Sequence, residues 1–268
     1  MKRFALAALL LFTAGAFAAG KGSIAFSDPS GDDNGPGEYV YPTDAVYAPG
    51  SFDMTGVEID YSERRVNFTV DFDSRMEDPW GMGTGFAVQM VLIFIDTDGK
   101  AGSGYSEGLP GLNIAFAEGH EWDKVVILSP QEKSRVTSEA DMKAEAMKDD
   151  ILVPTRTRGK GKSISGSIST KDLGDGDPST WGYQVVVQSN EGFPTDEDLL
   201  TRRVNEFEGQ HRFGGGNDGM CDPHVMDLLA GSASGAASEV EAQHQMLQYE
   251  CDAEGNPKKL ATLTMIRK

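Results

Sequence analysis

Cysteine and histidine are scarce in this chain, whose 268 residues include two cysteines and four histidines. The histidines lack the His-Glu-x-x-His spacing of zinc proteases, and no Cys-x-x-Cys-His stretch marks covalently attached haem. Basic residues are also few: 24 Lys and Arg against 42 Asp and Glu leave a formal net charge of -18. This charge argues against nucleic acid and anionic lipid as partners, because the long-range field repels both. We therefore expect a non-catalytic binding or structural module, not an enzyme.

Long apolar runs are missing after the first 20 residues, so we expect no membrane span in the mature protein. The opening MKRFALAALLLFTAGAFAAG combines two basic residues, a short apolar run and a small-residue site at Ala16 and Ala18. This pattern is typical of a secretory signal, with cleavage expected after Ala18 and export to the periplasm, cell surface or medium. In such a compartment Cys221 and Cys251 are expected to form a disulfide; a reactive thiol pair or metal ligands are the alternative.

Alternation of apolar and polar residues dominates the middle of the chain. Val66, Phe68, Val70 and Phe72 fall on one face of a strand and polar residues on the other. Residues 86–96 are almost wholly apolar, which indicates a central strand. Six strands are predicted in all, at residues 54–61, 66–72, 86–96, 124–128, 163–169 and 183–189. Between turns rich in Gly and Asp, they predict an all-β protein, an immunoglobulin-like or jelly-roll type β-sandwich.

Two segments interrupt this pattern. Residues 138–150 are rich in helix formers and predict a surface helix, with Ser138 at its start and Met142, Ala146 and Met147 on one stripe. The helix and the basic loop at 156–162 form an expected insertion at about 130–162 in a single domain of residues 24–230. Residues 231–268 are expected to be a linker and a C-terminal β-hairpin packed on that domain.

Clustered carboxylates follow the signal sequence, among glycines that allow backbone carbonyls to turn inward. Calcium takes six to eight oxygen ligands, whereas zinc prefers His and Cys, which this stretch lacks. A second candidate lies after the central strand, where Asp96, Asp98 and Glu107 only partly match a calcium-binding loop. The alternative is that these residues simply form turns. The calcium ligands predicted are Asp28, Asp32, Asp33, Asp44 and Asp53, with Asn34 beside them, and Asp96 and Asp98 in the second group.

Several motifs, in order, carry a family resemblance: DPSGDDNGPGEYVYPTD, GSFDMTGVEI, DPWG, VLIFIDTD, GLPGLN, DPSTWGY, FGGG and VMDLL. Over residues 24–229 the chain resembles the glucodextranase C-terminal-like domain, a DOMON-like relative of carbohydrate-binding module family 9. The resemblance implies a β-sandwich of the kind appended to extracellular glycosidases or surface proteins, and related modules carry structural calcium.

The resemblance also implies a ligand. Family 9 modules clamp a terminal sugar between two tryptophans, and Trp80 matches one of them; Trp122 or Trp181 is the candidate for the second. We therefore expect a calcium-stabilised module that binds a polysaccharide or cell-surface glycan. DOMON-like sandwiches also hold haem through Met, His or Lys, which makes Met82 and Met90 candidates for an electron-transfer role. A surface-layer or adhesion role, with contacts to cell-envelope proteins, is the third alternative.

Overall fold

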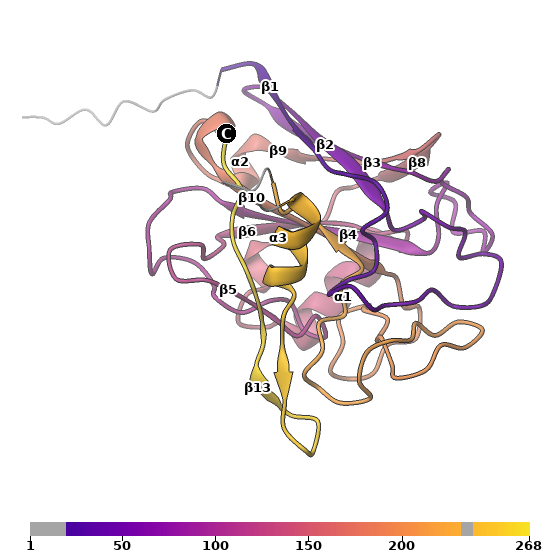
Figure 1. Cartoon of the computed structure of the whole chain (residues 1–268). Coiled ribbons are helices and arrows are strands. Elements are labelled where there is room, and N and C mark those ends of the chain that lie inside the picture. The colour runs from indigo at the N-terminus through magenta and orange to yellow at the C-terminus, as the bar shows by residue number, and fades with distance from the viewer. Residues whose placement is uncertain (1–19, 232–237) are drawn as a thin grey trace, which may run out of the picture.

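The computed structural model describes residues 20–231 and 238–268, so the predicted signal sequence lies outside the described part. Two five-stranded sheets face each other (Figure 1). The first has the order β1 (Gly22–Ser27), β2 (Met54–Tyr61), β3 (Arg65–Phe72), β9 (Ser163–Ser169) and β8 (Thr157–Lys160). The second has the order β11 (Asp227–Leu228), β10 (Gly182–Ser189), β4 (Gln89–Asp96), β6 (Lys124–Leu128) and β7 (Ile151–Leu152). The prediction of an all-β sandwich is confirmed.

Each of the six predicted strands is present, because the apolar pattern matches the faces that the sheets bury. In β3 the apolar side chains point into the core between the sheets and alternate with more exposed residues. In β4 Ile93 and Ile95 point into that core, while Leu92 and Phe94 point into a second core on the outer face. The strand begins at Gln89, three residues later than predicted.

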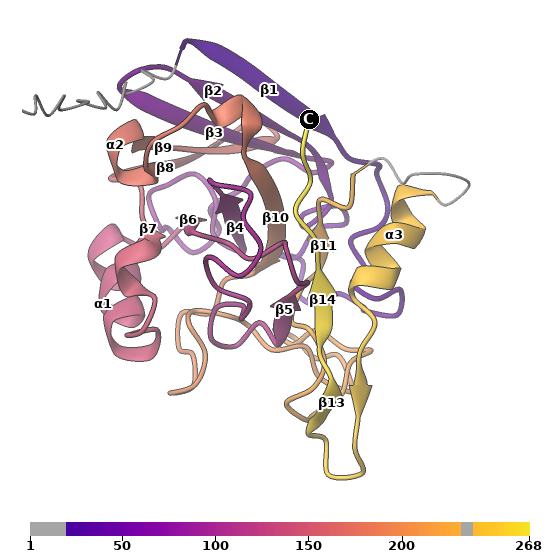
Figure 2. The same cartoon turned by 90° about the vertical axis from the view of Figure 1, so that its left-hand side faces the viewer.

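The second core explains why β4 is buried on both sides. It is covered by α1 (Lys133–Lys143), by α3 (Glu239–Met246) and by a parallel pair of strands, β5 (Ile114–Phe116) and β14 (Ala261–Leu263). Figure 2 shows these elements on the side of the second sheet that faces away from β1, β2 and β3. The chain thus adds a third layer to the sandwich, and its last strand pairs with a segment about 150 residues earlier in the sequence.

The predicted helix at 138–150 is shifted in the structure. α1 begins at Lys133 and ends at Lys143, and a short 3-10 turn, η1 (Lys148–Asp150), follows. Met142 and Ala146 are exposed, while Val136, Glu139 and Ala140 are the buried residues of the helix. Glu139 tolerates burial because Arg135 and Lys143, four residues to either side, each form an ion pair with it at 2.7 Å.

The C-terminal region contains the predicted hairpin, with β12 (Glu250–Cys251) antiparallel to β13 (Pro257–Lys259). The disulfide between Cys221 and Cys251 is present and joins the hairpin to the loop before β11. The predicted linker is partly wrong: residues 239–246 form α3, whose first turn is stabilised by a capping box between Ser238 and Glu241. The remaining short elements are α2 (Thr170–Leu173) and η2 (Pro178–Thr180). In the described residues, no helix has the length and apolar character that crossing a membrane requires.

Candidate functional site

Four carboxylates from three separate parts of the chain meet in the interior; we call them the buried acidic cluster. Asp28 follows β1, Asp32 lies in the next loop, Asp227 begins β11 and Glu239 begins α3. Oxygens of the three aspartates lie within 4.8 Å of one another, and the Glu239 carboxylate lies against Asp28 and Asp32. α3 is held here by Gln243, whose amide donates to the Asp32 carbonyl at 2.5 Å and accepts from Leu228 N at 2.9 Å.

Six oxygens of this cluster are buried without a hydrogen-bond partner in the described structure: both of Asp28, both of Asp32, Asp227 Oδ1 and Glu239 Oε2. Burial, reinforced by the neighbouring carboxylates, raises the pKa of Asp28 to about 11 and that of Asp32 to about 7. The pKa of Asp227, which is fully enclosed, is raised well above its ordinary value by the same causes. Unpaired buried carboxylates are costly, and a divalent cation would offset both the burial and the mutual repulsion.

The donor set fits calcium. All the unpartnered atoms are carboxylate oxygens, and their number falls in the six to eight that calcium accepts. Neither cysteine nor histidine belongs to the cluster, which disfavours zinc. The remaining contacts hold the ligands in place: Asp227 Oδ2 accepts from Met54 N at 2.6 Å, and Glu239 Oε1 accepts from Ala230 N at 2.7 Å.

Only part of the predicted first ligand group belongs to this cluster. Asp28 and Asp32 are central to it. Asp53 is adjacent, with Oδ2 accepting from Gly31 N at 2.8 Å and Oδ1 buried and unpartnered. Asp33 instead accepts from the Tyr41 hydroxyl. Asp44 is partly exposed, accepts from Val46 N and Gln210, and lies outside the cluster.

The predicted second group, Asp96 and Asp98, comes together with Asp123 after β4. Protein donors already serve its members. Asp96 is paired with Arg267, Asp98 with Lys100 at 2.9 Å, and Asp123 accepts from Thr97 N and its hydroxyl at 2.7 Å. Two of these carboxylates are therefore paired with protein cations and the third accepts hydrogen bonds, in contrast to the buried acidic cluster.

Trp80 lies on a loop whose conformation is set by its own sequence. The Asp78 carboxylate accepts from the backbone N–H groups of Met82 and Gly83, each at 2.7 Å. Gly81 and Gly83 have φ values of +68° and +82°, which glycine adopts without strain. The Trp80 ring is 39% exposed and packs edge-on against Tyr47 and His211. Because the contacts with Tyr47 and His211 cover only part of the ring, the rest of the ring is open to a ligand.

A hollow of about 530 Å³ lies in front of Trp80; we call it the Trp80 hollow. On its rim stands Phe193, 96% exposed on the loop after β10. Arg202 ties its walls together by pairing with Glu191 at 3.0 Å and donating to the His211 carbonyl at 2.7 Å. Its full lining is Trp80, Met82, Gln131, Asn190, Glu191, Gly192, Phe193, Arg202 and His211.

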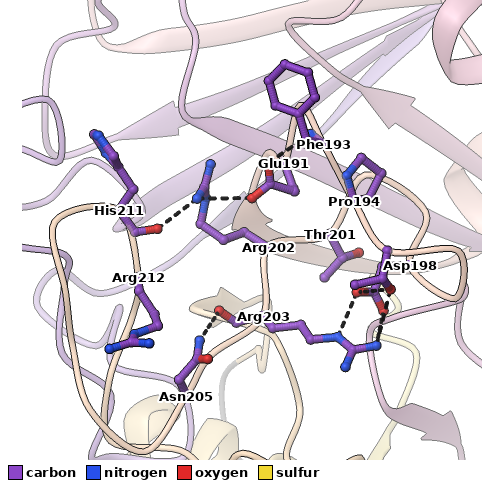
Figure 3. Close-up of a pocket in the computed structure, with 11 residues that line it drawn as sticks. Glu191, Phe193, Pro194, Asp198, Thr201, Arg202, Arg203, Asn205, His211 and Arg212 are labelled. Atoms are coloured by element: carbon purple, nitrogen blue, oxygen red, sulfur yellow. Dashed lines mark hydrogen bonds and ion pairs between the residues drawn. The ribbon is translucent and has the colours of Figure 1, made fainter.

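An adjoining hollow of about 250 Å³ shares Glu191, Phe193, Arg202 and His211 with the first. Figure 3 shows its walls, with Arg202 directed toward Glu191 on one side and Arg203 toward Asp198 on the other. Arg203 Nε donates to Asp198 at 2.7 Å. We call it the Arg203 hollow. Apart from Trp80 and Met82, none of these lining residues was singled out for this site from sequence, although Phe193 in Asn-Glu-Gly-Phe-Pro is an aromatic in a polar turn, which is a detectable signal.

The other predicted ligand residues lie in the interior. Trp122 is 0% exposed, packs against Phe94 and Tyr105, and donates from Nε1 to the Glu107 carbonyl at 2.8 Å. The structure thus corrects its expected place at a ligand surface. Trp181 is buried in the core between the sheets, and Met90 is buried in the outer core. Met82 alone among the predicted haem ligands lines the Trp80 hollow.

A family model described as the C-terminal binding module, SLH-like, of glucodextranase matches residues 24–265. The match continues past Leu229, where the sequence motifs end. It therefore includes α3, the C-terminal hairpin and β14. A search of the curated proteins gave no match.

Proposed function

Because the chain belongs to the family of C-terminal, SLH-like binding modules of glucodextranase, we propose that it is an exported, non-catalytic module that binds carbohydrate in the Trp80 hollow. One observation carries the proposal: Trp80 and Phe193, exposed aromatics from distant loops, border the same hollow. Exposed aromatic faces suit the apolar side of a pyranose ring. The disulfide is consistent with an oxidising compartment outside the cytosol.

Polar groups around the hollow supply the other half of sugar recognition. Gln131, Asn190, Glu191 and His211 line it together with Arg202, and amides and carboxylates are the groups that bind sugar hydroxyls. Asn190 and Glu191 are fixed by the sheet and by Arg202, since Asn190 N donates to Val88 O at 2.8 Å. A preformed wall of this kind reduces the entropy lost when a ligand binds.

The carboxylates near the hollow support a non-catalytic role. Glu191 and Asp198 are each engaged by an arginine, whereas a glycosidase needs a carboxylic acid free to protonate the leaving group. Residues 104–108, Gly-Tyr-Ser-Glu-Gly, fit the letters of a serine nucleophile elbow, which requires a turn from strand into helix. Here Tyr105 and Glu107 form strand-like bridges instead.

Glycan binding is tested by an array screen followed by calorimetry on Trp80→Ala and Phe193→Ala. We expect each variant to weaken binding of the best glycan by about 30-fold or more, the effect of removing an aromatic anchor. Phe207→Ala is the matched control, because Phe207 is also exposed and borders none of these hollows. Binding that survives in Trp80→Ala, with an unchanged melt, would contradict the proposal.

We also propose that calcium occupies the buried acidic cluster and stabilises the module. The support is the set of six buried carboxylate oxygens that have no hydrogen-bond partner in the described structure. Asp28, Asp32, Asp227 and Glu239 would hold the ion, with Asp53 next to them. The ion would contribute charge compensation and cross-linking of three chain segments, not chemistry on a substrate.

The calcium proposal is tested by titrating metal-free protein with Ca²⁺. One tight site is expected, and Asp227→Asn is expected to weaken it by at least about 100-fold, because a buried ligand and a charge are lost together. Asp44→Asn is the control, since it removes the same charge from a partly exposed position outside the cluster. Equal calcium affinity in the two variants would show that the cluster does not hold the ion.

Haem binding is a second candidate function. It is favoured by one observation, that Met82 and His211, two residue types that ligate haem iron, line the same hollow. A Soret band after reconstitution, lost in His211→Ala, would support this alternative. The aromatic pair Trp80 and Phe193 favours sugar as the occupant.

A further inference from the structure

A third hollow, of about 550 Å³, adjoins the Trp80 hollow. Gln131 lines both, and the chain neighbours Met82 and Gly83 line one each. The loop that carries Trp80 then contacts β8, the edge strand of the first sheet, where Gly159 N donates to Thr84 O at 2.8 Å. We call this space the α1 hollow, because Lys133 and Ser134 at the start of α1 form one wall. The Trp80 hollow thus shares lining residues with both the Arg203 hollow and the α1 hollow, and we call the three together the extended groove.

Positive charge is concentrated at the α1 end of this groove. Lys133 and Arg156 line the α1 hollow, and both side chains are exposed and form no ion pair within residues 20–231 and 238–268. Arg158 and Lys160 follow in β8, where they are exposed and alternate with the less exposed Thr157 and Gly159. Glu132 is the one acidic residue in the lining of this hollow. Such a surplus of cations is notable in a chain with a net charge of -18.

A groove of this length accommodates more than one sugar, and its chemistry changes along its course. Aromatic rings stand at the middle, and unpaired cations stand at one end. An exposed cation gains affinity from a ligand charge that it can reach, and a neutral ligand leaves it solvated. We propose that the extended groove binds an anionic oligosaccharide, with one sugar at Trp80 and the carboxylates or sulfates of neighbouring sugars at Lys133 and Arg156. This inference rests on the proposed glycan-binding function and specifies its ligand class.

The test compares three short oligosaccharides by calorimetry, at fixed calcium and low salt: an oligogalacturonide, its neutral carboxyl-reduced form, and a sulfated form of the latter. We expect the acidic oligomers to bind about tenfold more tightly than the neutral one, the effect of two exposed ion pairs. The preference should fall as salt rises, because exposed charges are screened. The two acidic arms distinguish carboxylate from sulfate as the group recognised.

The decisive variant is Lys133→Gln/Arg156→Gln, which should lose the preference for acidic oligomers while its affinity for the neutral oligomer changes less than about twofold. Lys258→Gln/Lys259→Gln is the matched control. It removes the same charge from β13, which projects away from α1 and β8 in both views (Figures 1 and 2). This control should retain the preference.

Four results would overturn the inference. If the neutral oligomer binds as tightly as the acidic ones, the cations of the groove play no part, while the proposed glycan binding stands. If both double variants lose the preference equally, net charge and not the groove determines it. Loss of binding to all three oligomers in Trp80→Ala only, with the double variant intact, would place the sugar at Trp80 and again exclude the α1 end. Failure of the native protein to bind any sugar on the array would overturn both proposals.

Discussion

At the scale of single residues, His224 links the loop beside the hollows to β11. Its Nδ1 accepts from Val204 N at 3.1 Å, so the ring is held neutral in a buried position. Burial lowers the pKa of His224 from 6.5 to about 4, with Arg203 acting in the same direction and Asp198 opposing it. A lowered pKa contributes stability that is full above pH 6.5 and is lost as the pH falls through about 4.

We therefore predict that His224→Asn makes unfolding less sensitive to acid. The variant is less stable than the native protein at pH 7, but the difference shrinks by on the order of 3 kcal/mol between pH 7 and 4. Urea unfolding of both proteins at several pH values checks this, and the carboxylate contributions cancel in the difference. Parallel curves for the two proteins would contradict the assignment.

The tryptophans illustrate what single residues reveal in sequence. Trp80 sits between Pro79 and Gly81 in a turn set by Asp78, and these near neighbours predict an exposed loop. Trp122 also has polar neighbours, but its burial comes from Phe94 and Tyr105, which lie 28 and 17 positions away in the chain. The turn that exposes Trp80 can be read from its neighbours in sequence, whereas the packing that buries Trp122 cannot. Only the exposure of Trp80 was therefore predictable.

At the scale of elements, the C-terminal hairpin is anchored by one covalent bond. Cys221 and Cys251 are separated by 30 residues, a loop for which closure in the unfolded chain corresponds to about 3 to 4 kcal/mol. We predict that Cys221→Ala/Cys251→Ala lowers the melting temperature by roughly 10 °C in a chain of this size. Thermal unfolding of the oxidised native protein and the variant is the measurement.

Reduction of the native protein is the control for this prediction, because it opens the bond without changing the side chains. Reduced protein and the variant should melt within a few degrees of each other. A variant as stable as the oxidised protein would mean that β14, paired with β5, anchors the tail unaided.

Elements with a strong two-residue period were predicted within a few positions, since one face of each strand is buried. α1 was misplaced because Glu139, polar in sequence, is one of its buried residues, neutralised by Arg135 and Lys143. α3 was taken for a linker, since small residues precede it. Two hydrogen bonds hold α3 in place: Gln243 donates to the Asp32 carbonyl, and Glu239 accepts from Ala230 N.

At the scale of the whole molecule, the buried acidic cluster joins parts of the chain that are about 200 residues apart. A search along the sequence finds Asp28 and Asp32, which are close neighbours, and adds Asp44, which lies outside the cluster. It cannot find Asp227 and Glu239, because only the folded sandwich brings β11 and α3 beside the loop after β1. The acidic stretch was thus visible in the sequence, but only half of the four carboxylates that meet in the cluster could be found there.

This arrangement gives the last prediction: calcium should control the attachment of α3 and the Asp32 loop to the sandwich more than the sandwich itself. A ligand at about 100 times its Kd stabilises the native state by about 2.7 kcal/mol. Excess chelator should therefore lower the melting temperature by about 5 to 10 °C for a chain of this size.

Hydrogen exchange on the metal-free protein should accelerate in Glu239–Met246 and around Asp32 while β3 and β9 stay protected, because those strands pair along seven residues away from the cluster. Asp227→Asn should reproduce this pattern in the presence of calcium and Asp44→Asn should not. A uniform rise in exchange across both sheets would instead mean that the ion stabilises the fold as a single unit, without a separate role at the C-terminal helix.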